Sequence, residues 1–236
     1  MTRRRWIADQ VSGGRALLLD KNAHHLARVL RAKVGQQFDV VADGRVRRGR
    51  IASISDQRVE FDLAEELPTS DLAVEISLLL SIFRFERMEW ALEKATEMGV
   101  ARFVPVIANR SEKHLVSAAG KRVERWRRIA HEAAQQARRA SVPEISVPVK
   151  VEEAISVGEG IVLAESEENR TLKRALAEMN TRSSLRLAVG PEGGFTSHEI
   201  EAFDKAHWRS ASLGKAILRA ETAAIAAVAV VIAELI

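Results

Sequence analysis

The first 66 residues show the pattern of a small β-rich module. Apolar and β-branched residues gather in short segments between turn residues, over 15–19, 36–44, 45–55 and 57–66. Asp43-Gly44 stands between two of these segments and is a strong signal for a two-residue hairpin. The pattern therefore predicts strands joined by tight turns.

One short helix interrupts this module, and a polar break ends it. The apolar residues of 24–30 recur at helical spacing. Residues 67–71, Leu-Pro-Thr-Ser-Asp, are typical of a linker. We therefore expect a first domain over 1–70 and a second over 71–236.

Strands and helices alternate in the second part of the chain. Residues 74–83 are a continuous apolar run, as expected of a buried strand in a parallel sheet. The predicted further strands are 100–107, 160–165, 185–190 and 210–214. The predicted helices are 86–99, 122–140, 168–179, 197–206 and 221–235. This alternation predicts an α/β domain with a mostly parallel sheet.

The composition narrows the class of protein. None of the 236 residues is cysteine, which excludes a disulfide framework, a thiolate metal site and a cysteine nucleophile. The absence of cysteine fits a reducing compartment, and we expect a cytoplasmic protein. The basic N-terminus has no apolar segment behind it, so no targeting segment is visible. The apolar stretch 223–236 is too short to span a bilayer and predicts a buried core or interface helix.

Positive charge is concentrated in the first 140 residues. The formal net charge is +4, but residues 1–70 carry +4, residues 84–140 carry +6 and residues 141–236 carry −4. Of the 36 basic residues, 27 are arginine, whose planar guanidinium suits phosphate. A polyanionic partner is one interpretation. The other is an ordinary solvated surface on an arginine-rich protein.

Several catalytic motifs are absent from the sequence. It contains no GxGxxG fingerprint, no phosphate-loop motif, no GxSxG turn and no HExxH. Nicotinamide enzymes, phosphate-loop nucleotidases, α/β-hydrolases and zinc proteases are therefore not leading interpretations. His24 and His25 are sequence neighbours that cannot easily converge on one ion, and we expect no metal site.

Two loops at predicted strand ends are candidates for chemistry. Residues 190–194, Gly-Pro-Glu-Gly-Gly, follow a strand and precede a helix capped by Thr196 or Ser197. Adjacent glycines permit close backbone approach, and ligands of open α/β sheets bind at the carboxyl ends of strands. Backbone groups there could bond the edge of an adenine. A tight strand-to-helix turn without a ligand is the alternative.

The second loop, over 212–223, also leads from a strand into a helix. Arg219 and Glu221 lie beside apolar residues, so each needs a partner if it is buried. A helix cap with a surface salt bridge is the alternative. Two such loops at equivalent strand ends predict a shared pocket.

These two loops carry a resemblance to a known family. GPEGGF at 190–195, followed by LGKAILRAETA at 213–223, closely resembles the RsmE family of bacterial 16S rRNA uridine-N3 methyltransferases, within the SPOUT superfamily. Similar segments occur in the same order at 24–31, 85–100 and 124–145. The resemblance covers the whole chain.

The resemblance implies both a fold and a cofactor. It implies an α/β domain with a trefoil-knotted parallel sheet over 71–236, after an RNA-binding, PUA-like β-barrel over 1–70. It implies a homodimer through the last helix. From the residues themselves we expect no membrane and no metal as partners. The cofactor implied is S-adenosylmethionine. The residues that would bind it are Leu163, Ala164, Glu165, Gly190, Pro191, Glu192, Gly193, Gly194, Leu213, Gly214, Ile217, Leu218 and Arg219.

The activity implied is methylation of N3 of uridine 1498 in 16S rRNA, on the assembled 30S subunit. Uridine N3 carries a proton and is a poor nucleophile until that proton leaves, so a base or a stabilising cation is needed. We expect Arg219 to supply the cation. Glu221 is either the base, the partner of Arg219 or a helix cap.

The RNA would be held largely through phosphates. The candidate contacts are Arg3, Arg5, Arg28, Arg31, Arg84, Arg110, Arg138 and Arg139. Trp6 either stacks near the RNA or belongs to the barrel core, and we expect Trp126 to be a packing residue.

Three places depart from the family pattern, and two alternative functions stay open. Phe83-Arg84-Phe85 is more apolar than the usual lysine- and glycine-containing stretch. Ala216 stands where many members carry a larger polar or basic residue, and Ala220 where threonine is usual. One alternative is a SPOUT enzyme that methylates tRNA ribose, although Asn109-Arg110 lacks the spacing of that motif. The other is a non-catalytic RNA-binding assembly factor, which has no need of cofactor loops.

Overall fold

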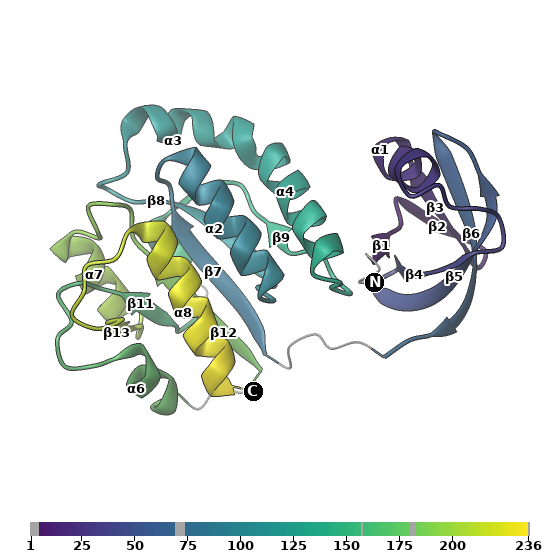
Figure 1. Ribbon diagram of the computed structural model, residues 1–236. Helices are drawn as coiled ribbons and strands as arrows, with labels where there is room; N and C mark the ends of the chain where they lie inside the picture. Colours follow the sequence, from purple (N-terminus) through teal and green to yellow (C-terminus); the bar gives the residue numbers. More distant parts are fainter. Residues whose placement is uncertain (1–4, 69–73, 157, 180–182, 236) are drawn as a thin grey trace. The chain divides into compact units, whose positions relative to one another are not determined.

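The computed structural model describes residues 5–68, 74–156, 158–179 and 183–235, which form two compact units (Figure 1). The first unit contains 5–68 together with 134–141. The second contains the remaining described residues. The predicted division near residue 70 did not include 134–141 in the first unit.

The first unit is built mainly from strands. Its strands are β1 (Trp6–Ile7), β2 (Gln10–Ser12), β3 (Arg15–Leu19), β4 (Gln37–Ala42), β5 (Arg45–Ile54) and β6 (Arg58–Glu66). Between β3 and β4 lie the helix α1 (Asp20–His24) and a π-helical turn (His25–Val29). The predicted hairpin is confirmed, because β4 pairs antiparallel with β5 and both Asp43 and Gly44 have positive φ.

The six strands form one strongly curled sheet in the order β1-β4-β5-β6-β3-β2. The segment after β1 donates backbone hydrogen bonds from Ala8 to Val41 in β4 and from Asp9 to Leu17 in β3, each 2.9 Å long. These bonds connect the segment after β1 to β4 and β3, which are each one strand in from opposite edges of the sheet. Gly49 lies beside a register shift, and an added Cβ there would lie 2.6 Å from Val40, so the close approach of the strands requires glycine.

Trp6 belongs to the core of this unit. Its side chain is fully buried, and its ring lies 5.8 Å from that of His25. Burial excludes the RNA-stacking alternative for Trp6 in this conformation. The added segment 134–141 also packs here, since Ala140 is buried in a cluster with Val41 and Val46.

The second unit alternates strands and helices, as the sequence predicts. Its strands are β7 (Glu75–Ser81), β8 (Arg102–Ile107), β9 (Glu144–Ile145), β10 (Val149–Lys150), β11 (Ile161–Leu163), β12 (Ser184–Val189) and β13 (Arg209–Ala211). Its helices are α2 (Phe85–Glu97), α3 (Lys113–Ala119), a 3-10 turn (Gly120–Arg122), α4 (Val123–Gln136, whose last residues belong to the first unit), α5 (Val151–Ile155), α6 (Leu172–Ala177), α7 (Ser197–Lys205) and α8 (Ala220–Leu235).

The sheet of this unit is parallel throughout the pairs described. Its order is β10-β8-β7-β12-β11-β13, with β9 beside β8. Strand β12 therefore lies between β7 and β11, although β11 precedes it in the chain. This order confirms the predicted α/β class.

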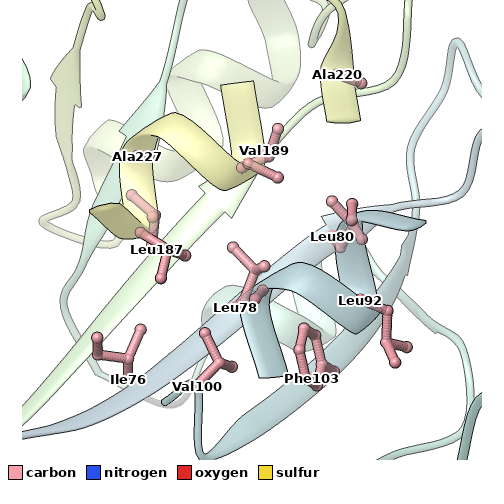
Figure 2. Packing of buried hydrophobic residues seen from close by; sticks show 14 of the residues in the cluster. Ile76, Leu78, Leu80, Leu92, Val100, Phe103, Leu187, Val189, Ala220 and Ala227 are labelled. Atoms are coloured by element: carbon pink, nitrogen blue, oxygen red, sulfur yellow. The ribbon is translucent and has the colours of Figure 1, made fainter. Parts of the chain in front are cut away.

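Apolar residues on the two faces of the sheet form two separate cores. Leu78 and Leu80 of β7 belong to the larger core, which α2 and α8 cover, as Figure 2 shows. Leu79 points the other way, into a core that includes Ala154 of α5 and Phe203 of α7. Because both faces are buried, the sequence of β7 shows a continuous apolar run.

Some elements were not anticipated from the sequence. The helices α3 and α5 are short and fall in segments without a clear apolar period. Trp126 is fully buried in the larger core, as expected, and meets Phe85 edge-on at 6.0 Å. Among the described residues, no helix is long and apolar enough to cross a membrane.

Candidate functional site

A cavity of about 710 Å³ lies at the carboxyl ends of the neighbouring strands β11, β12 and β13. Adjacent parallel strands end at the same edge of a sheet, so segments distant in sequence meet there. The predicted cofactor residues that line the cavity are Leu163, Ala164, Glu165, Gly190, Pro191, Glu192, Gly193, Gly194, Leu213, Gly214, Ile217 and Leu218. Arg219 is the predicted residue outside this lining.

Residues 190–194, which we call the glycine turn, need their glycines for geometric reasons. The Gly194 N–H donates to the Pro191 carbonyl at 2.8 Å, and Gly194 has a φ of +67°. A Cβ added to Gly190 would lie 3.2 Å from backbone atoms of Gly194 and Phe195. The turn is therefore closed tightly on itself and presents backbone atoms to the cavity.

The C-terminal loop, residues 212–219, is anchored at its base. The Ser212 N–H donates to the Arg170 carbonyl, and the Leu172 N–H donates to the Ser212 carbonyl, both at 2.9 Å. The rest of the loop is more open, and Ile217 is 84% exposed although it lines the cavity. An apolar side chain so exposed at a cavity wall is available to a ligand.

The segment after β11 is organised by a carboxylate. Glu167 accepts hydrogen bonds from the backbone N–H groups of Asn169, at 2.8 Å, and Arg170, at 2.9 Å. These two bonds stabilise the charged form and lower the pKa of Glu167 below its ordinary value. Because the Arg170 carbonyl holds Ser212, Glu167 also orders the base of the C-terminal loop.

Glu221 pairs with an arginine that the sequence analysis did not consider as its partner. Its side chain is 7% exposed, and its Oε1 lies 3.6 Å from Nε of Arg87 on α2. Arg87 also approaches Glu192 of the glycine turn at 3.9 Å. Arg219 is exposed, and neither it nor Glu221 lines the cavity. Of the roles left open for Glu221, pairing with Arg219 is therefore replaced by pairing with Arg87.

Sequence reasoning missed part of the cavity wall. The additional lining residues are Arg110, Ser166, Val189, Phe195, Ser197, Ile200, Glu201, Ala211, Ser212, Lys215, Ala216, Ala220 and Ala223. Ser212, Lys215, Ala216, Ala220 and Ala223 lie inside the predicted loop 212–223 but are not among the predicted cofactor residues. Most of the others flank the predicted segments and could have been found by extending each segment by a few residues. Ala216 and Ala220 both line this cavity.

Arg110 is the exception, because it does not flank any of the predicted loops. It follows β8, and its Nη1 donates to the Gly193 carbonyl at 2.6 Å. The charge of Arg110 alone predicts an RNA contact. Its position just beyond a predicted strand was the available signal for a place at the sheet edge.

The arginines assigned to RNA have varied surroundings. Arg28 is exposed and pairs with Asp56 at 2.6 Å; its hydrogen bond lowers the pKa of Asp56 below the ordinary value. Arg5 donates to the carbonyl of Arg138 within the first unit. Arg31, Arg84 and Arg138 are exposed.

The remaining two candidates differ from these. Arg139 is buried and lies 3.4 Å from the Ser141 hydroxyl, an environment that suits a structural role. Arg3 lies outside the described residues. Across the described part of the chain, no cluster of histidine and acidic side chains could hold a metal ion.

Comparisons with known families match both parts of the chain. The sequence model of an RNA methyltransferase domain matches residues 70–232, and that of an RNA methyltransferase PUA domain matches residues 18–64. The first match alone covers more than half of the chain.

Known proteins resemble the chain over most of its length. Ribosomal RNA small subunit methyltransferase E of Aquifex aeolicus is 31% identical, over 92% of this chain and 94% of that protein. The protein of the same name from Bacillus subtilis is 28% identical, over 89% and 87%. The crystal structure of this enzyme from Neisseria gonorrhoeae, bound to S-adenosylmethionine, has a TM-score of 0.83 at 26% identity and covers 96% of this chain and 95% of that one. The chain belongs to the RNA methyltransferase family of ribosomal RNA small subunit methyltransferase E.

Proposed function

We propose that this protein transfers a methyl group from S-adenosylmethionine to N3 of uridine 1498 in 16S rRNA, within the assembled 30S subunit. The observation that carries the proposal is the meeting of the two predicted loops and of residues 163–165 in one cavity at the carboxyl edge of the sheet. Family membership supports the acceptor class, because the relatives are named as methyltransferases of small-subunit ribosomal RNA.

The shape and chemistry of the cavity fit this cofactor. Its volume of about 710 Å³ lies in the range of small-molecule sites. The glycine turn offers backbone donors and acceptors suited to the edge of an adenine, while Leu163, Leu213 and Leu218 offer apolar surface. A Cβ on Gly193 would come within 3.3 Å of Cδ of Arg110, so a larger residue there would have to displace the Arg110 side chain. We infer that these residues hold the cofactor.

The bound cofactor supplies a methyl group on a sulfonium, which is a good leaving group. The protein then has to align the acceptor nitrogen and manage its proton. We propose that Arg219, exposed just before α8, stabilises the negative charge that develops on the uracil. The burial of Glu221 and its contact with Arg87 favour a positioning role for Glu221 over that of the base.

Recognition of the RNA is assigned to exposed arginines. We propose that Arg28 and Arg31 in the first unit and Arg84 in the second contact phosphates, because their side chains face solvent. Uridine N3 lies on the Watson–Crick edge, so the target base has to be unpaired or flipped out.

We also infer that the second unit contains the trefoil knot of the SPOUT superfamily. The strand order supports this inference, since β12 lies between β7 and β11 while β13 lies on the far side of β11. Knots are nearly absent from proteins, so this feature rests on family membership together with that order.

Methyl transfer to defined acceptors tests the function. Purified protein with methyl-labelled S-adenosylmethionine is offered 30S subunits lacking the modification, free 16S rRNA, 50S subunits and tRNA in parallel, followed by nucleoside digestion. We expect label in 3-methyluridine, from 30S subunits only. Label in tRNA or in a ribose-methylated nucleoside would contradict the proposed acceptor. Absence of label from every acceptor would favour a non-catalytic RNA-binding protein.

A further inference from the structure

We propose that Arg110 is a positioning residue for the glycine turn, and that Glu199 fixes the segment that carries Arg110. This proposal rests on the proposed binding of S-adenosylmethionine in the cavity. It gives Arg110 a different role from the RNA contact that its charge suggests. The inference depends on the contacts of both side chains.

Arg110 contacts Gly193 in two ways, through its guanidinium and through its methylene stem. Its guanidinium donates from Nη1 to the Gly193 carbonyl at 2.6 Å and lies 3.5 Å from the carbonyl of Phe195. Its methylene stem occupies the space beside the Gly193 Cα, because an added Cβ would meet Cδ of Arg110 at 3.3 Å and Cβ of Arg110 at 3.5 Å. A charge-assisted hydrogen bond and a van der Waals contact therefore hold the same residue of the turn.

Glu199 connects the two segments that make this contact. Its carboxylate, 1% exposed, accepts the backbone N–H of Asn109 on Oε1 at 2.7 Å. Its Oε2 accepts the backbone N–H of Thr196 at 2.7 Å and the Thr196 hydroxyl at 2.9 Å. One carboxylate thus bonds the neighbour of Arg110 and the residue that follows Phe195. These residues lie far apart in the chain, so the link is tertiary.

The segment that carries Arg110 is fixed on its other side as well. The Ser111 N–H donates to the Ala108 carbonyl at 3.0 Å, and the buried Ser111 hydroxyl donates to the Ile82 carbonyl at 2.8 Å. Arg110 therefore starts from a backbone with little freedom. A long side chain on a fixed backbone loses less entropy when it binds the turn.

The consequence is that Arg110 sets the shape of one cavity wall. Both Arg110 and Gly193 line the cavity, and the turn has to present its backbone groups at fixed positions to bind a ligand. Removing the guanidinium leaves the Gly193 carbonyl without this donor and lets the turn move. The affinity for the cofactor then falls, whereas contacts to RNA phosphates stay.

The test compares Arg110→Met, which keeps most of the stem and removes the donors, with Arg110→Lys, which keeps one charged donor group. Arg102→Met is the matched control, because Arg102 lies at the opposite end of β8 and pairs on the surface with Glu144. Calorimetry without RNA gives the Kd for S-adenosylmethionine. Steady-state methyl transfer to 30S subunits gives the KM for each substrate and its dependence on salt.

We expect Arg110→Met to raise the Kd and KM for S-adenosylmethionine about 10-fold, with partial rescue in Arg110→Lys and no change in Arg102→Met. The KM for 30S subunits and its salt dependence should stay as in the wild type. A phosphate contact would behave in the opposite way, since its loss raises the KM for RNA and reduces the salt slope by about one. That pattern, with unchanged cofactor affinity, would overturn the proposal.

A second measurement does not depend on the cofactor. Amide hydrogen exchange of the ligand-free protein reports the order of residues 190–196 directly. We expect faster exchange there in Arg110→Met and in Glu199→Gln, whose amide NH₂ has to face one of the two backbone N–H groups that Glu199 binds. Wild-type exchange in both variants would overturn the positioning role. Failure of wild-type protein to bind S-adenosylmethionine would instead contradict the proposed function, and the exchange data would still decide the role of Arg110.

Discussion

Arg219 and Glu221 are separated by one residue, yet their environments differ. Arg219 is exposed at the end of the C-terminal loop, while Glu221 is buried in the first turn of α8 against Arg87. The side chain of Glu221 contacts the guanidinium of Arg87 and does not line the cavity. A structural role therefore suits Glu221 better than that of a base.

The two residues should therefore respond differently to substitution. Arg219→Ala is expected to lower kcat by roughly 10²-fold to 10³-fold, as for other donors that stabilise developing charge, without lowering Tm. Glu221→Gln is expected to lower Tm, because Arg87 loses its nearest carboxylate, and to change kcat only a few-fold. Steady-state methyl transfer and thermal unfolding of both variants check this. A loss of kcat in Glu221→Gln as large as that in Arg219→Ala, at unchanged Tm, would make Glu221 the base.

At the scale of elements, the N-caps of helices α7 and α6 differ in how many hydrogen bonds they make. Thr196 caps α7 in a full capping box, in which its hydroxyl accepts from the Glu199 N–H and Glu199 bonds back to the Thr196 N–H. Thr171 caps α6 with a single hydrogen bond, from the Arg174 N–H at 3.3 Å. The Thr196 hydroxyl also donates a hydrogen bond to the buried carboxylate of Glu199.

Thr196→Ala should therefore cost more than Thr171→Ala. We expect a loss of about 2 kcal/mol for Thr196→Ala, because a cap is lost and a buried carboxylate loses a donor, against about 1 kcal/mol for Thr171→Ala. Urea unfolding of the two variants and of Thr196→Ser, which keeps the hydroxyl, measures the difference. Equal losses in the two alanine variants would mean that the Thr196 hydroxyl contributes no more than an ordinary cap.

Elements with a strong local pattern could be predicted from the sequence. The turn residues Asp43-Gly44 indicate the hairpin, and a continuous apolar run indicates the buried strand β7. Each signal lies within a few residues of sequence. The helix α3 was missed because its seven residues give too few repeats for a helical period. The two loops of the candidate site were found because glycine and charged residues at strand ends are themselves local signals.

Tertiary contacts were beyond the reach of local patterns. The pairing of Glu221 with Arg87 and that of Arg110 with Gly193 join residues on elements that only the sheet order brings together. The assignment of residues 134–141 to the first unit has the same cause, because the sequence gives no sign that the end of a helix packs in another unit. An arginine that contacts a loop and one that faces solvent carry the same charge. The sequence alone therefore could not distinguish Arg110 from the exposed arginines.

At the scale of the whole molecule, the apolar surface of helix α8 predicts that the protein associates with a second copy of itself. It is apolar on nearly every side, and one side packs on the sheet through Ala224, Ala227, Val228 and Val231. Ala229 and Ala233 are exposed on the remaining surface. A helix that is hydrophobic all round is normally buried, so we propose that the exposed side is covered by a second copy of the chain, as the family resemblance implies.

Sedimentation equilibrium tests this proposal. The wild type should sediment at about twice the chain mass of 26.1 kDa. Ala229→Glu should shift it toward the monomer, because a desolvated charge opposite its own copy in a two-fold interface is unfavourable. Ser117→Glu, at an exposed site on α3, is the matched control and should stay dimeric. A wild type that sediments as a monomer at micromolar concentration would contradict the proposal. A dimer that Ala229→Glu leaves intact would place the interface on a surface other than α8.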